Sequence, residues 1–309
     1  MVVTPHHAQR PGPRTAGTLG SLSGALRFGD LDQRPELASA ALAAFAAASP
    51  GQHHLVCGHP SRMGQVPLAE DLRACSAVLV AASATSLHGV LAVCPYSAEQ
   101  ATLWGPATVD GPHSATARAL VAQARAALGS AGFTSVRTLI DQRNRELRTA
   151  YLAQGFTRWK DDVVYERILG GDLPQESAVE AVLKADQGVV AQILSEAFPE
   201  SDHASKGLAV RTKEGYRHYL IHDQERIAGA AAVHGAGSRV WLNLIAVGTP
   251  WRGKGWSRRL LVGVCALEAR RGASVMGLEV LGDNRPAIRL YQGCGFTRSF
   301  SASVLTAPV

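Results

Sequence analysis

Residues 244–261 read LIAVGTPWRGKGWSRRLL, and residues 278–296 read LEVLGDNRPAIRLYQGCGF. The first stretch joins an apolar run to a turn containing Gly253 and Gly255, and the turn leads into a helical pattern. Backbone N–H groups at a helix start have no partner within the helix, and the helix dipole is positive there. The glycines permit the close approach of a ligand. We therefore predict a site for a pyrophosphate, with an ordinary strand-to-helix turn as the alternative.

Part of the second stretch has a counterpart earlier in the chain. Residues 141–156 read DQRNRELRTAYLAQGF, whereas residues 281–296 read LGDNRPAIRLYQGCGF. The spacing predicts two tandem copies of the same fold, and the repeat is clear over the last third of each half. The repeated residues are separated by 140 positions: Asn144 and Asn284, Tyr151 and Tyr291, Gly155 and Gly295, and Phe156 and Phe296.

The length also favours two domains, because 309 residues are many for a single hydrophobic core. Residues 1–24 mix Pro, Gly, His and Arg without hydrophobic periodicity, which predicts a mobile tail. A Gly-rich break at 170–177 follows a strand-like run. We therefore predict a first domain at 25–170 and a second domain at 171–309.

Each half has the same coarse pattern of elements. The tight spacing of three central strands predicts an antiparallel meander, and the whole order predicts an α/β (α+β) fold with a mixed, mainly antiparallel sheet flanked by helices. Asp186 is the expected N-cap of the first helix, whose apolar stripe includes Val189. The expected elements of the second half are strand 178–184, helix 186–197, strands 217–222, 226–233 and 240–247, helix 256–271, strand 275–280, a helix from 284, and strand 296–305, which closes this half.

Composition excludes several classes of protein. Hydrophobic residues make up 46% of the chain and charged residues 18%, which excludes disorder. No apolar run reaches the roughly 18 residues of a membrane span. The net charge of +6 is +3 in residues 1–170 (15 basic, 12 acidic) and +3 in residues 171–309 (16 basic, 13 acidic), so we expect no nucleic acid or membrane partner. The N-terminus has no signal-like apolar run and the five cysteines form no dense framework, which predicts a reducing, cytoplasmic setting.

The two stretches together resemble the GNAT superfamily of acyl-CoA-dependent N-acetyltransferases. Its signature is Arg/Gln-x-x-Gly-x-Gly/Ala, then a strand and Asn-x-x-Ala-x-x-x-Tyr-x-x-x-Gly-Phe. The second half resembles protein N-terminal acetyltransferases, and the tandem layout resembles mycothiol synthases. Ser257 departs from the usual Gly/Ala. The matching residues are Arg252, Gly253, Lys254, Gly255 and Trp256, then Asn284, Ala287, Tyr291, Gly295 and Phe296.

The resemblance implies acetyl-CoA as cosubstrate, without a metal. It places pantetheine against Ile245 and Val247, the pyrophosphate at residues 252–257, and the arm beside the thioester at Asn284. The loop residues implied are Arg252, Gly253, Lys254, Gly255, Trp256 and Ser257. Lys254, Arg258 and Arg259 either meet the remaining phosphates or form a solvated helix face.

The resemblance also suggests catalytic residues. Tyr291 is the expected general acid for the departing thiolate, with a packed aromatic as the alternative. Glu279 is the expected base acting through water, with a solvated or Arg-paired carboxylate as the alternative. Asn243 stands where many relatives carry glutamate, and an amide cannot act as a base.

The first half lacks these features. At the 140-residue offset, its loop is Gly111-Pro112-His113-Ser114-Ala115-Thr116-Ala117 and Leu139 replaces Glu279, so Tyr151 is expected to pack rather than react. The group His53, His54, Cys57 and His59 fits no zinc pattern well.

The partner remains open at this stage. We expect a small-molecule or peptide amine acceptor, and a monomer with pseudo-dimeric halves or a homodimer. The alternative function is a non-catalytic acyl-CoA-binding or interaction module.

Overall fold

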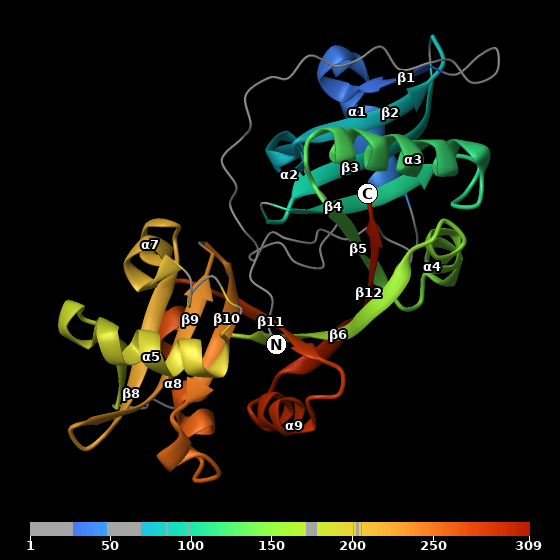
Figure 1. Ribbon diagram of the computed structural model, residues 1–309. Coiled ribbons are helices and arrows are strands. Elements are labelled where there is room, and N and C mark those ends of the chain that lie inside the picture. The colour runs from blue at the N-terminus through green and yellow to red at the C-terminus, as the bar shows by residue number, and fades with distance from the viewer. Residues whose placement is uncertain are drawn as a thin grey trace. The chain divides into compact units, whose positions relative to one another are not determined.

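The computed structural model divides into two compact units (Figure 1). Unit 1 is Asp162–Phe300, and unit 2 is formed by residues 27–161 with Ser301–Val309. The predicted tail at 1–24, the histidine-rich group at 53–59 and most of the predicted break at 170–177 lie outside the described residues. The structure describes residues 27–47, 69–84, 86–97, 99–170, 178–199, 201, 204, 206–235 and 237–309.

The sheet of unit 1 has the strand order β6-β11-β10-β9-β8-β7. Neighbouring strands are antiparallel except β10 and β11, which are parallel. The predicted meander of three strands is confirmed as β8, β9 and β10. The bounds are β6 (Thr157–Ile168), β7 (Val179–Ala181), β8 (Arg217–Asp223), β9 (Arg226–His234), β10 (Arg239–Val247) and β11 (Val275–Leu281).

Helices cover both faces of this sheet (Figure 1). The helices α5 and α7 pack on one face over a core that includes Val190 and Leu194, whereas α8 and α9 pack on the other over a core that includes Leu260. The bounds are α5 (Gln187–Ala197), α7 (Leu208–Lys213), α8 (Trp256–Arg270) and α9 (Arg285–Gly293), with short 3₁₀ helices η4 (Lys184–Asp186) and η5 (Thr249–Trp251).

Two local predictions for α5 and its approach need correction, and a third is confirmed in position only. The strand expected at 178–184 ends at Ala181, because Lys184–Asp186 turn into a 3₁₀ helix. Asp186 stands at the N-cap of α5 in helical backbone conformation, and its side chain makes no capping bond to the described residues. Val189 is 47% exposed, so the buried stripe of α5 consists of Val190, Ile193 and Leu194.

Unit 2 repeats the architecture, with the strand order β1-β2-β3-β4-β5-β12 and β4 and β5 as the parallel pair. The predicted fold class is therefore confirmed in both units. The bounds are β1 (Arg27–Asp30), η1 (Leu31–Gln33), η2 (Pro35–Leu37), α1 (Ala38–Ala46), α2 (Ala69–Ala74), β2 (Ala77–Ala82), β3 (Leu87–Pro95), β4 (Gln100–Thr108), α3 (Ala115–Ser130), β5 (Ser135–Asp141), α4 (Arg145–Leu152) and β12 (Thr297–Pro308).

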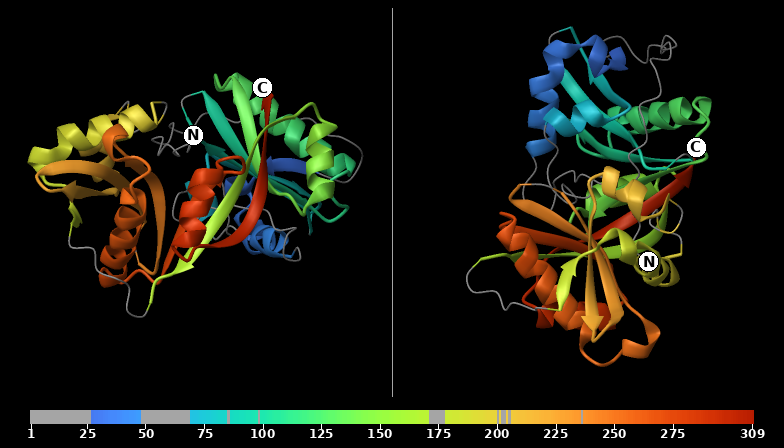
Figure 2. Two further views of the ribbon diagram at one scale, coloured as in Figure 1. Left: turned by 90° about the horizontal axis from the view of Figure 1, so that it is seen from below. Right: turned by 90° about the vertical axis from the view of Figure 1, so that its left-hand side faces the viewer.

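The last strand of each half completes the sheet that the other half begins. β6 pairs with β11 from Val275↔Ile168 to Leu281↔Asp162, and β12 pairs with β5 from Ala302↔Asp141 to Pro308↔Ser135. Figure 2 shows the dark-red end of β12 beside β5. The prediction that strand 296–305 closes its own half is wrong, because repeated halves offer each last strand two equivalent edges. The predicted domain limits, 25–170 and 171–309, describe the two halves of the sequence repeat and stay a prediction.

Two features bear on the predicted compartment. No helix of the described residues is long and apolar enough to cross a membrane. Cys75 and Cys94 form a disulfide with their Cα atoms 4.4 Å apart, a pairing that the sequence analysis did not predict. The cytoplasmic location stays a prediction.

Candidate active site

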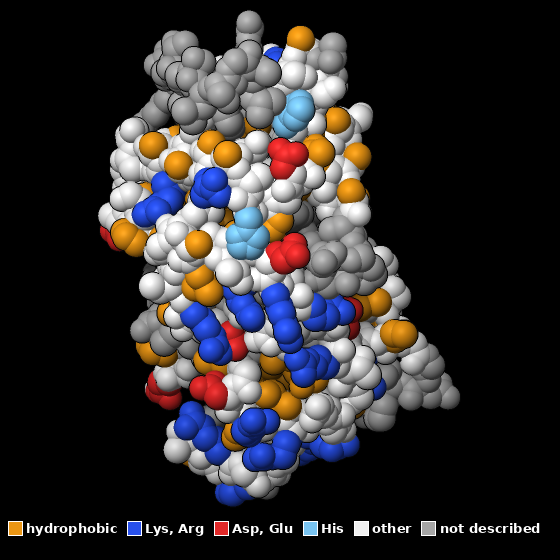
Figure 3. Space-filling view, turned by 90° about the vertical axis from the view of Figure 1, so that its right-hand side faces the viewer, with side chains coloured by type: hydrophobic (Ala, Val, Ile, Leu, Met, Phe, Trp, Pro, Cys, Tyr) orange, Lys and Arg blue, Asp and Glu red, His pale blue; other side chains and the backbone are white. Residues whose placement is uncertain are grey.

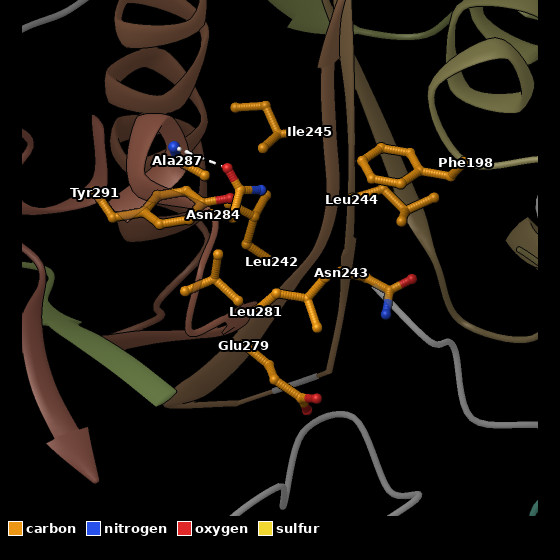
Figure 4. Close-up of a pocket in the computed structure, with 11 residues that line it drawn as sticks. Phe198, Leu242, Asn243, Leu244, Ile245, Glu279, Leu281, Asn284, Ala287 and Tyr291 are labelled. Carbon is orange, nitrogen blue, oxygen red and sulfur yellow. Dashed lines mark hydrogen bonds between the residues drawn. The ribbon is translucent and has the colours of Figure 1, made fainter. Parts of the chain in front are cut away.

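A cleft opens between the two parallel strands of unit 1. β10 and β11 pair from Arg239↔Val275 to Leu242↔Leu278, and in the described chain they share no register pair beyond this point. A cavity of about 90 Å³ lies where they separate (Figure 4). Its lining residues are Phe198, Leu242, Asn243, Leu244, Ile245, Glu279, Val280, Leu281, Asn284, Ala287 and Tyr291.

A β-bulge explains where the strands separate. The register between β10 and β9 shifts between Leu242 and Leu244, so that Asn243 is an extra residue on β10. A bulge bends its strand and increases the local twist. Because the bulge follows the last β10–β11 pair, it directs the remainder of β10 away from β11.

The glycine turn lies between the end of β10 and the start of α8. Gly253 has φ +73° and Gly255 has φ +84°, and a Cβ at either residue would meet nothing within 4 Å. Glycine is therefore required by the backbone conformation, which leaves the space in front of the turn open. Gly255 is the N-cap of α8, and among the described residues no side chain caps this helix. These features fit the predicted pyrophosphate site.

Cations surround the turn. Arg252, Lys254, Arg258 and Arg259 are exposed, and exposed Lys and Arg side chains also gather on the face shown in Figure 3. Arg252 Nε donates to the carbonyl of Val247 at 3.1 Å, which ties the turn to the end of β10. The Arg259 guanidinium lies 4.3 Å from the centroid of the Trp256 ring. The exposure of these side chains fits both contact with phosphates and a solvated helix face.

Tyr291 reaches the cavity from α9. The residue is 6% exposed, and its hydroxyl has no hydrogen-bond partner among the described residues. Figure 4 shows the hydroxyl directed toward Asn284. Burial raises the pKa of Tyr291 above its ordinary value, so the hydroxyl keeps its proton at neutral pH.

Asn284 holds the start of α9. Its Oδ1 accepts a hydrogen bond from the backbone N–H of Ala287 at 3.3 Å, which makes Asn284 the N-cap (Figure 4). Asn144 makes the equivalent bond to Leu147 in the first half. The capping role uses the amide oxygen, so the amide NH₂ is the group that could meet a cofactor.

Glu279 and Asn243 lie on the opposite side of the cavity from Tyr291. Leu278 and Val280 belong to the core beneath α8, so strand alternation turns Glu279 toward the other face of the sheet. The ends of the Glu279 and Asn243 side chains point away from Tyr291 in Figure 4. The structure thus brings the predicted acid and base to one cavity, on different sides of it.

Sequence reasoning missed Phe198, which lines the cavity directly after α5. A single aromatic residue in a loop gives no signal that separates a ligand contact from ordinary packing. The apolar lining residues Leu242, Leu244, Val280 and Leu281 were expected only as strand residues for the same reason.

The comparison with known protein families agrees with this geometry. Residues 189–296 match the family described as "Acetyltransferase (GNAT) family". This match lies within the C-terminal half and includes the glycine turn, Asn284 and Tyr291. No curated protein matches the chain.

Solved structures show that the GNAT fold extends over the chain. A GCN5-related N-acetyltransferase from Sphaerobacter thermophilus has a TM-score of 0.61 at 17% identity, over 75% of this chain and 80% of that one. A tandem GNAT protein from the clavulanic acid biosynthesis pathway has a TM-score of 0.61 at 17% identity, over 92% of this chain and 98% of that one. A glucosamine N-acetyltransferase region of a fungal multi-domain GH3 β-N-acetylglucosaminidase has a TM-score of 0.67 at 10% identity, over 93% of this chain and 39% of that one.

In unit 2, groups at the positions equivalent to the candidate site of unit 1 already have hydrogen-bond partners within the protein. The β4–β5 register ends at Leu103↔Thr138, and the Tyr151 hydroxyl donates to the carbonyl of Gly105 at 2.7 Å. The side chain of Ser114 caps α3 by accepting from Ala117 N at 3.1 Å. That the first half has no catalytic site stays a prediction, and these bonds support it.

Proposed function

We propose that the protein is an acetyl-CoA-dependent N-acetyltransferase whose C-terminal half transfers an acetyl group directly to an amine in a ternary complex. The observation that carries the proposal is the cavity between β10 and β11. Tyr291 lines this cavity, and its hydroxyl has no hydrogen-bond partner among the described residues. β10 leads from this cavity to the glycine turn. One strand thus leads from the cavity that Tyr291 lines to the turn that would bind the pyrophosphate.

Main-chain groups would hold most of the cofactor. Residues 252–257 would bind the pyrophosphate through N–H groups at the start of α8. Ile245 and Val247 lie on β10 beyond its last β11 partner, so their peptide groups could pair with the pantetheine amides as a strand would. Asn284 would offer its amide NH₂ near the thioester end.

Two side chains would move protons. Bound acetyl-CoA supplies a thioester carbonyl, at which a C–N bond forms and the C–S bond breaks. The Glu279 carboxylate would accept one proton from the amine nitrogen through water. The Tyr291 Oη would give its proton to the leaving sulfur, and its raised pKa ensures that this proton is present at neutral pH. No covalent enzyme intermediate is required.

The alternative is a non-catalytic acyl-CoA-binding or interaction module. The glycine turn serves both functions equally well. The contrast between the two tyrosines favours an enzyme, since Tyr151 has a backbone partner and Tyr291 has none among the described residues. A hydroxyl that lies in a cavity is available to a ligand, whereas a hydroxyl bonded to the backbone is not.

The test is release of free thiol from acetyl-CoA by the full chain with a panel of amines. The panel contains 2-phenylethylamine, spermidine, lysine, a peptide with a free N-terminus and an aminoglycoside. Amine-dependent thiol release, with an acetylated product found by mass spectrometry, is the expected result. Calorimetric binding of acetyl-CoA without thiol release from any amine would support the binding module instead.

A further inference from the structure

We infer that Asn243 is a binding residue for the acceptor, with its side-chain carbonyl oxygen accepting a hydrogen bond from an N–H of the acceptor amine. This inference rests on the proposed N-acetyltransferase function and deepens it. The chemistry around Asn243 also indicates the substrate class: a primary amine attached to an apolar group.

The first observation is a buried oxygen without a donor. Asn243 is 2% exposed and lines the cavity, and its Oδ1 has no hydrogen-bond partner among the described residues. Buried side-chain oxygens in folded proteins are nearly always hydrogen-bonded, because leaving one unpaired is costly. An oxygen that accepts hydrogen bonds requires a donor, which an amine can provide and a thioester carbonyl cannot.

The second observation is the position of Asn243 in the sheet. Leu242 packs in the core beneath α8 and Leu244 packs in the core beneath α5, and Asn243 is the extra residue between them. Bulges re-aim side chains next to functional sites. Here the bulge holds the amide on the side of the cavity opposite to Tyr291 (Figure 4).

The neighbouring side chains indicate the kind of amine. Glu279 supplies a carboxylate on the same side of the cavity as Asn243, which favours a cationic amine on entry. Phe198, Leu244 and Leu281 supply apolar surface in the same lining, which favours an apolar group attached to the nitrogen. One N–H of the amine would then be held by Asn243 while another proton leaves toward Glu279.

The test uses two variants of nearly equal shape. Asn243→Leu removes both polar atoms, whereas Asn243→Asp keeps the acceptor oxygens and, when ionised, has no donor. The readout is the calorimetric Kd of 2-phenylethylamine for the full chain saturated with CoA, a complex that cannot react. We expect a loss of about tenfold or more in Asn243→Leu, and a change within a few-fold in Asn243→Asp. The acetyl-CoA Kd and the melting temperature of both variants serve as controls for folding.

The outcomes separate this inference from the proposed function. Equal loss in both variants would mean that Asn243 donates rather than accepts, and would overturn the inference. Unchanged affinity in Asn243→Leu, or no binding of 2-phenylethylamine to the parent protein, would also overturn it. The proposed function fails on a different result, namely the absence of thiol release with every amine of the panel.

Discussion

The two equivalent tyrosines offer a test in which each variant is the control of the other. Tyr291→Phe and Tyr151→Phe each remove one hydroxyl and keep the ring. Tyr151 donates to the Gly105 carbonyl and is 0% exposed, whereas Tyr291 lines the cavity without a partner among the described residues. We therefore expect Tyr151→Phe to reduce stability and Tyr291→Phe to reduce turnover.

The magnitudes follow from these contacts. Removing the Tyr151 hydroxyl leaves a buried carbonyl without this donor, which costs about 1–3 kcal/mol of unfolding free energy. Removing the Tyr291 hydroxyl breaks no hydrogen bond to the described residues, so we expect a stability change within about 0.5 kcal/mol. If the hydroxyl is the general acid, its loss lowers kcat by about 10²-fold or more, while the acetyl-CoA Kd stays within a few-fold.

The assay combines urea unfolding, acetyl-CoA calorimetry and single-turnover kinetics with the best amine of the panel. Single-turnover conditions report the chemical step, so slow product release cannot hide a loss. A parent-like single-turnover rate in Tyr291→Phe would refute the assignment of Tyr291 as the acid. A stability loss in Tyr291→Phe as large as that in Tyr151→Phe would show that both tyrosines are packing residues.

Three further predictions concern the turn, the base and pH. Gly255→Val should weaken acetyl-CoA binding, measured by calorimetry at one site per chain, whereas Gly272→Val, at φ +96° beyond the other end of α8, should reduce stability alone; equal affinity in both variants would contradict the pyrophosphate site. Glu279→Gln should lose most kcat/KM at low pH, where the amine is protonated, and should approach the parent rate as pH rises, so a loss that is equal at every pH argues against a base. Burial, with a smaller effect of nearby Arg211, lowers the pKa of His218 to about 4. Below the ordinary histidine pKa of about 6.5, the unfolded state therefore binds a proton that the folded state does not bind. Urea titrations should show that the unfolding free energy of the parent protein falls by about 2 kcal/mol more between pH 7 and pH 5 than that of His218→Gln.

The fold could be predicted from the sequence because its signals are local. The repeat of Asn, Tyr, Gly and Phe predicts the duplication, and the glycine turn between a strand and a helix distinguishes the half that is predicted to bind phosphate. Gly253 and Gly255 have the positive φ values that only glycine adopts easily, so the residue type itself predicts the backbone conformation of the turn. The predicted bounds of α8, 256–271, differ from the observed Trp256–Arg270 by one residue.

The remaining features depend on contacts between distant residues. β6 and β12 are alike in pattern, and either could complete either sheet, so alternation of side chains cannot reveal the exchange. The bulge at Asn243 is a property of the register with β9 and has no signature in the residues themselves. Asn284 was expected beside the cofactor, and the structure adds a capping bond to Ala287 N that uses its oxygen.

The duplicated halves show why a shared motif does not establish a shared function. Both halves keep an asparagine cap, a tyrosine two turns later, and a pair of parallel strands whose pairing stops early. In unit 2, the Gly105 carbonyl accepts from Tyr151 and the start of α3 receives the side chain of Ser114, so groups that a ligand would use already have partners. A ligand there would have to displace these bonds, each worth about 1 kcal/mol to the folded chain. In unit 1, among the described residues, the Tyr291 hydroxyl has no partner and no side chain caps the start of α8, so a ligand could bind there without breaking bonds of the fold.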